Sequence, residues 1–145
     1  MKYQDYIFNV KKRKFIGDFD KMYQDEREIG FDSWKASDTN NMQKKISYDL
    51  INSYNFDKIL DIGCGKGSFT NLLKKNNNNV DGIDISKTAI NEARRIYGHK
   101  VNFHCIKENE IIDFIFNEDK ILDLIVMMEV LSYVDEWKKM IENIS

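Results

Sequence analysis

The sequence has little of what builds disulfide scaffolds or metal sites: two cysteines, two histidines and no proline in 145 residues. Cys64 and Cys105 cannot form a framework of several disulfides, and we expect both to stay reduced in the cytoplasm. His99 and His104 have no metal-site spacing to each other or to the cysteines, so no metal is expected. The absence of proline carries no inference about function.

Long apolar runs and an excess of one charge are missing as well. No apolar stretch approaches the roughly 20 residues that cross a membrane, and the first residues lack the pattern of a signal peptide. A net charge of −2 provides no global basic field, so we expect neither a membrane nor a nucleic acid as partner. With 42% hydrophobic and 12% aromatic residues, the chain can form one domain with a real core.

The stretch at residues 58–70, KILDIGCGKGSFT, organises the chain. Its apolar start is typical of a buried strand, and the residues after it carry apolar side chains at helical spacing. Between them, Gly63, Gly65 and Gly67 stand at every second position. Such a turn lets a ligand approach the backbone closely and points helix N–H groups toward it. The alternative is a plain strand–helix junction.

Asp61 distinguishes this turn from a dinucleotide-binding one. A pyrophosphate would be repelled by a carboxylate two residues before the first glycine. Ser68 also stands where the third glycine of G-x-G-x-x-G belongs. A carboxylate beside the turn suits a ligand with positive charge, such as an ammonium or sulfonium group.

Further strand and helix patterns follow in alternation. Strands are expected at residues 80–85, 101–106 and 121–127, with helices after them. Asp84 ends the second strand, where an acid can accept hydrogen bonds from both ribose hydroxyls of a nucleotide. The alternative is that Asp84 only caps a helix or a turn. His104 alternates with apolar neighbours and is interpreted as structural.

Asp61 with Gly63, Gly65 and Gly67 resembles the first motif of the class I S-adenosylmethionine-dependent methyltransferases. The resemblance covers about residues 39–145. It implies that the glycine loop holds the amino-acid part of the cofactor and that the end of the second strand holds its ribose. The cofactor-binding residues implied so far are Asp61, Gly63, Cys64, Gly65, Gly67, Asp84 and Ile85.

Two later segments are interpreted through the same resemblance. The family has an acid near the adenine after its third strand; here Lys107 stands there and Glu108 follows, so their backbone groups would make the contact. Met128 resembles part of the fourth motif, which closes over the methionine end of the cofactor. Glu129 and Tyr133 are the catalytic candidates by position, and local packing is the alternative for both.

The resemblance implies an α/β fold, a Rossmann-like doubly wound parallel sheet with strand order 3-2-1-4. The family continues through three more strands, which this sequence lacks. The fourth strand, residues 121–127, would therefore expose an edge that another molecule can pair with. We expect self-association through this edge, or a piece of a longer protein that is less stable than its parent.

The first 38 residues are expected to form a lid-like segment, and residues 39–145 the core. The basic run at residues 11–14 is interpreted as a solvated helix face. A helical stripe of Phe15, Phe19, Met22 and Tyr23 is expected to pack on the core. Trp34 is either an anchor for this segment or, with Tyr23, an aromatic wall over the cofactor.

Residues 39–54 are expected to form a helix. Apolar residues repeat at every fourth position, and Asp38 or Thr39 would cap its start. The repeat consists of Met42, Ile46, Leu50 and Tyr54.

The expected function is transfer of a methyl group from S-adenosylmethionine, leaving S-adenosylhomocysteine, to an oxygen or nitrogen of a small or polar acceptor. Two alternatives remain open. One is a methyltransferase fragment that binds the cofactor without turnover. The other is an NAD-dependent oxidoreductase, which Asp61 and the glycine spacing oppose.

Overall fold

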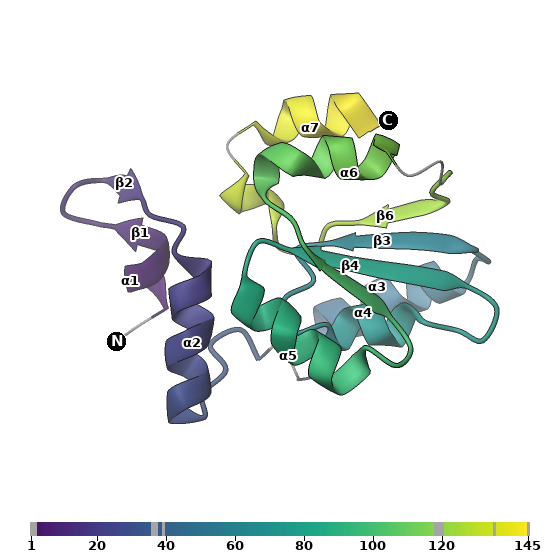
Figure 1. The fold of residues 1–145 in the computed structure, drawn as a ribbon, viewed down its shortest axis with the longest axis horizontal. Coiled ribbons are helices and arrows are strands. Elements are labelled where there is room, and N and C mark those ends of the chain that lie inside the picture. Colours follow the sequence, from purple (N-terminus) through teal and green to yellow (C-terminus); the bar gives the residue numbers. More distant parts are fainter. Residues whose placement is uncertain (1–2, 36–37, 39, 118–120, 135, 145) are drawn as a thin grey trace.

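The computed structural model describes residues 3–35, 38, 40–117, 121–134 and 136–144. A sheet of parallel strands forms its centre (Figure 1): β3 (Lys58–Ile62), β4 (Asn79–Asp84), β5 (Asn102–Cys105) and β6 (Leu124–Val126). Their order is β5-β4-β3-β6. Counted along the chain, this is the predicted order 3-2-1-4.

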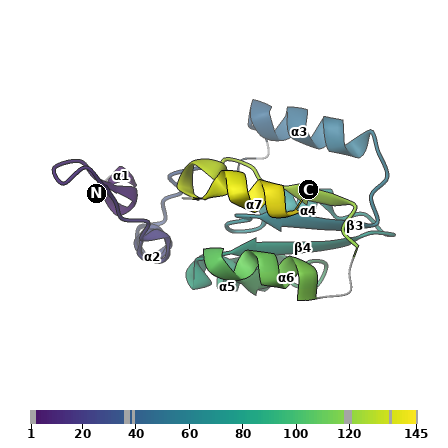
Figure 2. The ribbon, with the colours of Figure 1, turned by 90° about the horizontal axis from the view of Figure 1, so that it is seen from above.

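The helices cover both faces of this sheet, because side chains alternate between the faces along each strand. Ile59 and Val80 pack in one cluster with side chains of α3 (Met42–Asn52), α4 (Ser68–Leu73) and α5 (Lys87–Tyr97). Leu60, Ile62 and Ile83 pack in another with α6 (Ile111–Asn117) and α7 (Trp137–Ile144). Figure 2 shows α3 and α6 on opposite sides of the sheet.

Strand β6 forms one edge of the sheet. It pairs with β3, and no other strand among the described residues pairs with it. Helix α7 lies beyond β6 on this side of the sheet (Figure 1). Met140 of α7 is buried in the cluster that includes Ile125 of β6 and its neighbour Met127, so α7 packs on the same apolar cluster as β6.

The N-terminal segment stands at the end of the sheet where β3 and β4 finish (Figure 1). It consists of α1 (Gln4–Ile7), a hairpin of β1 (Phe8–Asn9) and β2 (Lys14–Phe15), and α2 (Phe19–Ile29). Met22 and Tyr23 of α2 are buried, as predicted.

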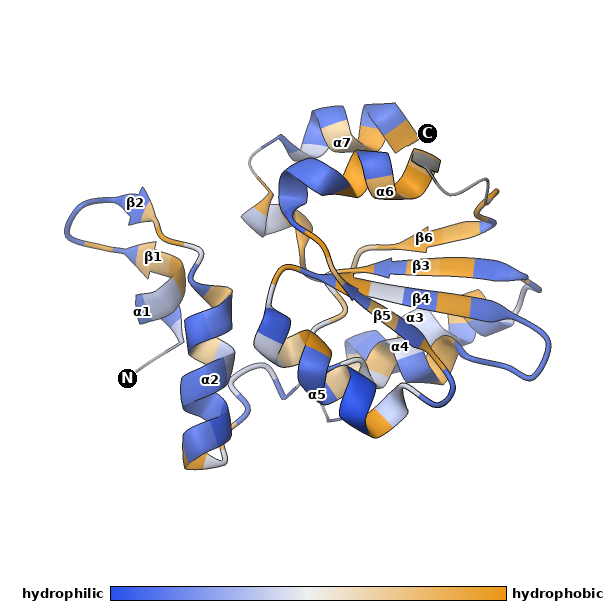
Figure 3. Cartoon of the chain, in the orientation of Figure 1, coloured by the Kyte–Doolittle hydropathy of each residue, from blue (hydrophilic) through white to orange (hydrophobic). Residues whose placement is uncertain are grey.

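Two expectations for this segment are wrong. The basic residues 11–14 form the turn of the hairpin and the start of β2 rather than a helix face, and the turn is hydrophilic in Figure 3. Phe15 lies in strand β2 and not in a helix, although the helical stripe was predicted to include it. The physical reason is Gly17, which adopts the left-handed conformation with φ of 67° and separates β2 from α2. Asp18 then caps α2 by accepting a hydrogen bond from the backbone N–H of Lys21.

Helix α3 is shorter than predicted. Asn41 caps it instead of Asp38, and Thr39 lies outside the described residues. The side-chain oxygen of Asn41 accepts hydrogen bonds from the backbone N–H groups of Gln43 and Lys44. The apolar repeat that predicted the helix faces solvent, whereas Tyr48 and Ile51 pack on the core. The exposed fractions are 71% for Met42, 61% for Ile46, 64% for Leu50 and 61% for Tyr54.

No helix in the described part of the chain combines the length and the apolar character needed to cross a membrane.

Candidate functional site

A cavity of about 730 Å³ lies where the N-terminal segment meets the ends of β3 and β4. The predicted site residues on its wall are Tyr23, Trp34, Asp61, Gly63, Cys64, Gly65, Asp84, Ile85, Glu108, Met128, Glu129 and Tyr133. Gly67 and Lys107 are the predicted residues that do not line it. The cavity has room for a nucleoside-sized ligand and a second small molecule.

The glycine loop turns beside the cavity between β3 and α4. The backbone N–H groups of Gly63 and Cys64 donate to the carbonyl oxygen of Ile83 at 2.8 and 3.0 Å, which ties the loop to the end of β4. Gly65 has φ of 53°, and a Cβ there would lie 2.8 Å from the hydroxyl oxygen of Tyr23. The loop and the N-terminal segment therefore touch at Gly65, on the wall of the cavity.

Gly67 has a packing role. It stands at the N-cap of α4 with φ of 78°, and a Cβ there would lie 2.6 Å from the ring of Phe103. Only glycine fits this approach of loop to core without a shift of the ring. Gly67 thus allows the glycine loop to pack closely on the core.

Asp61 is a buried carboxyl group on the cavity wall. It is 3% exposed, and one of its oxygens accepts a hydrogen bond of 2.7 Å from the hydroxyl of Thr70. Burial raises the pKa of Asp61 to about 7, against the hydrogen bond from Thr70, which lowers it. A cationic group placed in the cavity would favour the ionised form of this carboxyl.

Asp84 joins the two loops at the ends of β3 and β4. Its Oδ2 accepts from the backbone N–H of Gly65 at 2.9 Å, and its Oδ1 accepts from the backbone N–H of Ser86 at 2.8 Å. Burial raises the pKa of Asp84, and these backbone hydrogen bonds oppose the rise. Each carboxylate oxygen retains a second lone pair, so Asp84 can still accept bonds from ligand hydroxyls.

The segment after β5 contributes apolar side chains that the sequence interpretation missed. Ile106 and Ile111 line the cavity together with Glu108, whereas Lys107 is exposed. The backbone N–H of Lys107 donates to Oε2 of Glu110 at 3.1 Å. The missed signal was the pair Ile106 and Ile111 on either side of Lys107 and Glu108, because apolar side chains suit the face of a flat ring in a ligand.

Aromatic rings form another part of the cavity wall. Tyr133 packs edge-on against Phe19 with ring centroids 5.3 Å apart, and its centroid is 6.3 Å from that of Trp34 and 6.4 Å from that of Phe15. Tyr3 adds a ring at 6.0 Å from Trp34. We call Tyr3, Phe15, Phe19, Trp34 and Tyr133 the aromatic wall; all five line the cavity. Sequence interpretation assigned Phe15 and Phe19 to core packing and missed Tyr3.

Glu129 contributes a further carboxyl group to the cavity. It follows Met128 after the end of β6 and lines the cavity. Its φ is 56°, a left-handed conformation that is uncommon for a residue with a Cβ. Tyr133 follows within a short 3₁₀ helix (Leu131–Tyr133), and burial raises the pKa of its hydroxyl, so it is a neutral group at pH 7.

Metal chemistry has no support among the described residues, where no three His, Cys, Asp or Glu side chains cluster closely enough to hold an ion. Burial raises the pKa of the Cys64 thiol well above its usual value, so it lines the cavity as a neutral group. The polar groups of the cavity thus include carboxyl groups, the phenols of three tyrosines, two serine hydroxyls and the amine of Lys44.

Comparison with known proteins identifies the family of this chain. A family model described as "Methyltransferase domain" matches residues 60–145. The ubiquinone biosynthesis O-methyltransferase of Rickettsia typhi is 32% identical over 100 residues, which are 69% of this chain and 39% of that protein. The protein of the same name from Coxiella burnetii is 30% identical over 88 residues, 59% of this chain and 36% of its own length. The chain therefore spans less than two fifths of these relatives.

Solved structures show the same fold. The plantazolicin methyltransferase BpumL in complex with SAH superposes with a TM-score of 0.60 at 20% identity, over 98% of this chain and 51% of that one. Magnesium protoporphyrin IX methyltransferase from Synechocystis PCC 6803 with bound SAM gives 0.55 at 18% identity, over 83% of this chain and 56% of that one. Since the family model covers more than half of the chain, the protein belongs to the methyltransferase domain family.

Proposed function

We propose that this protein binds S-adenosylmethionine and transfers its methyl group to an oxygen of a small acceptor that carries an aromatic ring. The observation that carries the proposal is the division of the cavity. The carboxyl groups of buried Asp61 and half-buried Asp84 line the cavity at the strand ends, and the aromatic wall lines the same cavity. Glu129 lines the same cavity and would take the proton of the acceptor.

The wall with the carboxyl groups fits the cofactor. Asp61 would pair with the ammonium group of its methionine part, beside the glycine loop. Asp84 would accept hydrogen bonds from the ribose hydroxyls. Ile106 and Ile111 would flank the adenine. Structures of the plantazolicin and magnesium protoporphyrin methyltransferases contain SAH or SAM, which supports this choice of ligand.

The aromatic wall fits the acceptor. The rings are inclined to one another, by 72° for Phe19 with Tyr133 and 37° for Trp34 with Tyr133, which leaves edges and faces for a further ring. These side chains would hold a flat acceptor by stacking. The curated relatives from R. typhi and C. burnetii are named O-methyltransferases, which favours a hydroxyl group over an amine as the methylated group.

In the proposed reaction, the bound cofactor supplies a methyl group made electrophilic by its sulfonium. Glu129 takes the proton of the acceptor hydroxyl, whose oxygen forms the new bond to the methyl carbon as the carbon–sulfur bond breaks. The electron pair of that bond stays on sulfur and leaves a neutral thioether. Tyr133 donates a hydrogen bond that orients the acceptor. Alignment of the two reactants provides most of the rate enhancement.

A second candidate is cofactor binding without turnover. The chain spans 36–39% of the length of the relatives named above, and the rest of such proteins can hold part of an acceptor site. In this case the cavity would bind S-adenosylhomocysteine with full affinity, yet no acceptor would be methylated. The nicotinamide alternative loses support, because the chain belongs to a methyltransferase family.

Two further parts of the proposal concern the N-terminal segment and the edge of the sheet at β6. We infer that residues 1–38 act as a lid, since their aromatic side chains close one side of the cavity. Self-association through β6 remains a prediction, and sedimentation at several concentrations tests it.

Calorimetry with S-adenosylhomocysteine and with NAD on the same preparation tests the proposed ligand. Binding of the first and not of the second is expected. Methyl transfer from labelled S-adenosylmethionine to a panel of small phenols and aromatic amines then separates the candidates, with Glu129→Gln as the matched variant. Tight cofactor binding without transfer to any phenol, by this chain or by the full-length gene product, would leave the binding function alone standing.

A further inference from the structure

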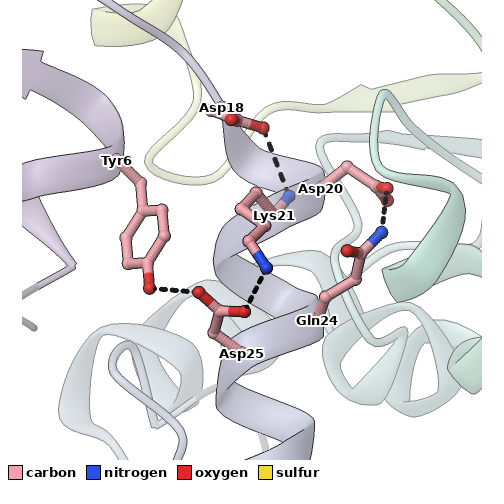
Figure 4. A network of polar contacts seen from close by, with 6 residues as sticks. All are labelled: Tyr6, Asp18, Asp20, Lys21, Gln24 and Asp25. Atoms are coloured by element: carbon pink, nitrogen blue, oxygen red, sulfur yellow. Dashed lines mark hydrogen bonds and ion pairs between the residues drawn. The ribbon is translucent and has the colours of Figure 1, made fainter.

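Helix α2 contacts both loops that form the cofactor side of the cavity, through residues that do not line the cavity themselves. Figure 4 shows that Asp20 and Gln24 lie on one side of α2, and Asp25 with its partner Tyr6 on the other. Asp20 belongs to the side that meets the core. The outer side carries Lys21, which pairs with Asp25 at 2.7 Å in solvent.

The first contact joins α2 to the glycine loop. Lys66, between Gly65 and Gly67, has a side chain only 13% exposed. Its Nζ lies 3.7 Å from Oε2 of Glu26 and 5.6 Å from the ring centroid of Tyr23, both on α2. Asp32 adds a carboxylate at 4.0 Å. Because Glu26 is 5% exposed, this pair is shielded from water, and loss of Lys66 would leave the Glu26 carboxylate buried without its cation.

The second contact joins α2 to the loop after β4. One oxygen of Asp20 accepts a hydrogen bond of 2.8 Å from the hydroxyl of Ser86 and another of 2.8 Å from the backbone N–H of Thr88. Burial alone would raise the pKa of Asp20, but the bonds from Thr88 and Ser86 outweigh it, so the pKa lies below its usual value. Asp20 therefore stays ionised at the N-terminal end of α5, where a negative charge is stabilised.

Asp84 connects the two contacts to each other. It accepts from Gly65 in the glycine loop and from Ser86 in the next loop. On one side, Asp20 of α2 bonds to Ser86, whose backbone N–H bonds to Asp84. On the other side, Asp84 holds the glycine loop, and Lys66 of that loop pairs with Glu26 of α2. A displacement of α2 therefore pulls on both backbone groups that hold Asp84.

We propose that Lys66, Glu26 and Asp20 are positioning residues that couple the docking of α2 to the geometry of Asp84 and the glycine loop. They control cofactor affinity without touching the cofactor. The affinity part rests on the proposed function. Linkage between α2 and the glycine loop also exists in the ligand-free protein, where it can be measured by itself.

A double-mutant cycle on the buried pair tests the proposal. Lys66→Met and Glu26→Gln should each weaken binding of S-adenosylhomocysteine by about tenfold, and the double variant by no more than either single change, because the two groups act as one unit. Lys66→Arg should restore most of the affinity, since it keeps the charge. Lys21→Met is the matched control: it removes an ion pair from the same helix on its exposed side and should leave affinity within about twofold.

Hydrogen exchange in the ligand-free protein separates this coupling from the proposed function. Lys66→Met should speed exchange in residues 19–29 and also in residues 63–67, whereas Lys21→Met should leave residues 63–67 unchanged. Failure of the unaltered protein to bind S-adenosylhomocysteine would overturn the proposed function, and exchange alone would then decide the linkage. The coupling is overturned if affinity in folded Lys66→Met stays within about twofold, if the two losses multiply, or if faster exchange is confined to α2.

Discussion

The two walls of the cavity are built in different ways. The strand-end wall takes its residues from consecutive turns of one sheet, and the register that pairs Ile62 with Ile83 sets the positions of Asp61 and Asp84. The aromatic wall gathers rings from the start of α1, the β1–β2 hairpin, the first residue of α2, a loop and a 3₁₀ helix. Leu60 and Ile83 behind the first wall are 1% exposed, whereas Phe15 in the second is 38% exposed.

This contrast indicates which part of the cavity can change its side chains and its conformation. The strand-end wall rests on a close-packed core, so a change there must break packing or strain the backbone. The aromatic wall packs on a smaller buried cluster than the sheet does, formed by Ile7, Met22, Tyr23 and Ala89, so we expect it to open and adjust more easily. A constant cofactor and a variable acceptor would require this division. The following predictions test it, starting with the largest effect.

The strand-end wall should be intolerant of a side chain at Gly65. Gly65→Val forces a β-branched residue to φ of 53° and places its Cβ 2.8 Å from the Tyr23 hydroxyl. Binding of S-adenosylhomocysteine should weaken by about 3 kcal/mol, roughly a hundredfold. Gly30→Ala is the control, because Gly30 has φ of 67° with nothing within 4 Å of the added Cβ. It should cost stability and leave affinity unchanged. Full affinity in Gly65→Val would show that the loop is only structural.

Loss of the Asp84 carboxylate should have the next largest effect. Asp84→Ala removes the acceptor of two backbone hydrogen bonds and of the proposed bonds from ribose, so affinity should fall by roughly 1–3 kcal/mol.

Asp123 provides the control for Asp84. Its Oδ2 also accepts two backbone hydrogen bonds, from Asp57 and Lys58, but at the opposite end of β3. Asp123→Ala should lower the melting temperature without changing the affinity measured by calorimetry. Unchanged affinity in folded Asp84→Ala would remove Asp84 from the site.

Asp61 should make cofactor binding depend on pH. Its pKa of about 7 means that the ionised form, which pairs with an ammonium group, becomes dominant only above neutrality. Affinity for S-adenosylhomocysteine should therefore rise about tenfold from pH 6 to pH 8. Asp61→Asn should give a flatter profile with weaker binding, and an equally steep profile in that variant would assign the titration to another group.

The same pKa predicts an opposite trend for stability. The folded state holds the Asp61 proton up to about pH 7, whereas an Asp in the unfolded chain releases it near its usual pKa of 3.8. The folded protein thus binds more protons between these values, and its stability should fall as pH rises through this range. Denaturant titrations of the unaltered protein and of Asp61→Asn measure the difference.

The smallest effect should appear in the aromatic wall. Binding of S-adenosylhomocysteine should slow hydrogen exchange in residues 15–35 by about threefold to tenfold, while exchange in β3 and β4 changes little. The reason is that cofactor contact at Gly65 also stabilises the neighbouring Tyr23. Equal protection of residues 15–35 in both states would argue against a lid.

Sequence reasoning predicted the strand-end wall because its signals are local. The apolar strand, the glycines and Asp84 lie within a short stretch, and a parallel sheet brings the ends of β3 and β4 together. Residues of the aromatic wall are separated by more than a hundred positions, from Tyr3 to Tyr133, and no local pattern joins them. Phe15 was misassigned because its spacing to Phe19 is helical, although Gly17 interrupts the helix.

Helix α3 shows another limit of periodicity. Its repeat at every fourth residue identified the helix, but the repeat does not reveal which face meets the core. Tyr48 and Ile51 occupy the buried side, and Leu50 is 64% exposed. The position of α7 beside β6 was equally beyond local signals, because it depends on the sheet having an open edge.

The backbone of Glu129 has a consequence for engineering. A residue with φ of 56° is held in a conformation that costs about 1 kcal/mol and that glycine adopts without penalty. A library selected for heat resistance alone should therefore enrich Glu129→Gly and discard the carboxylate beside the acceptor. The most heat-resistant version of this domain and its most active version would then be different sequences, separated at this one position.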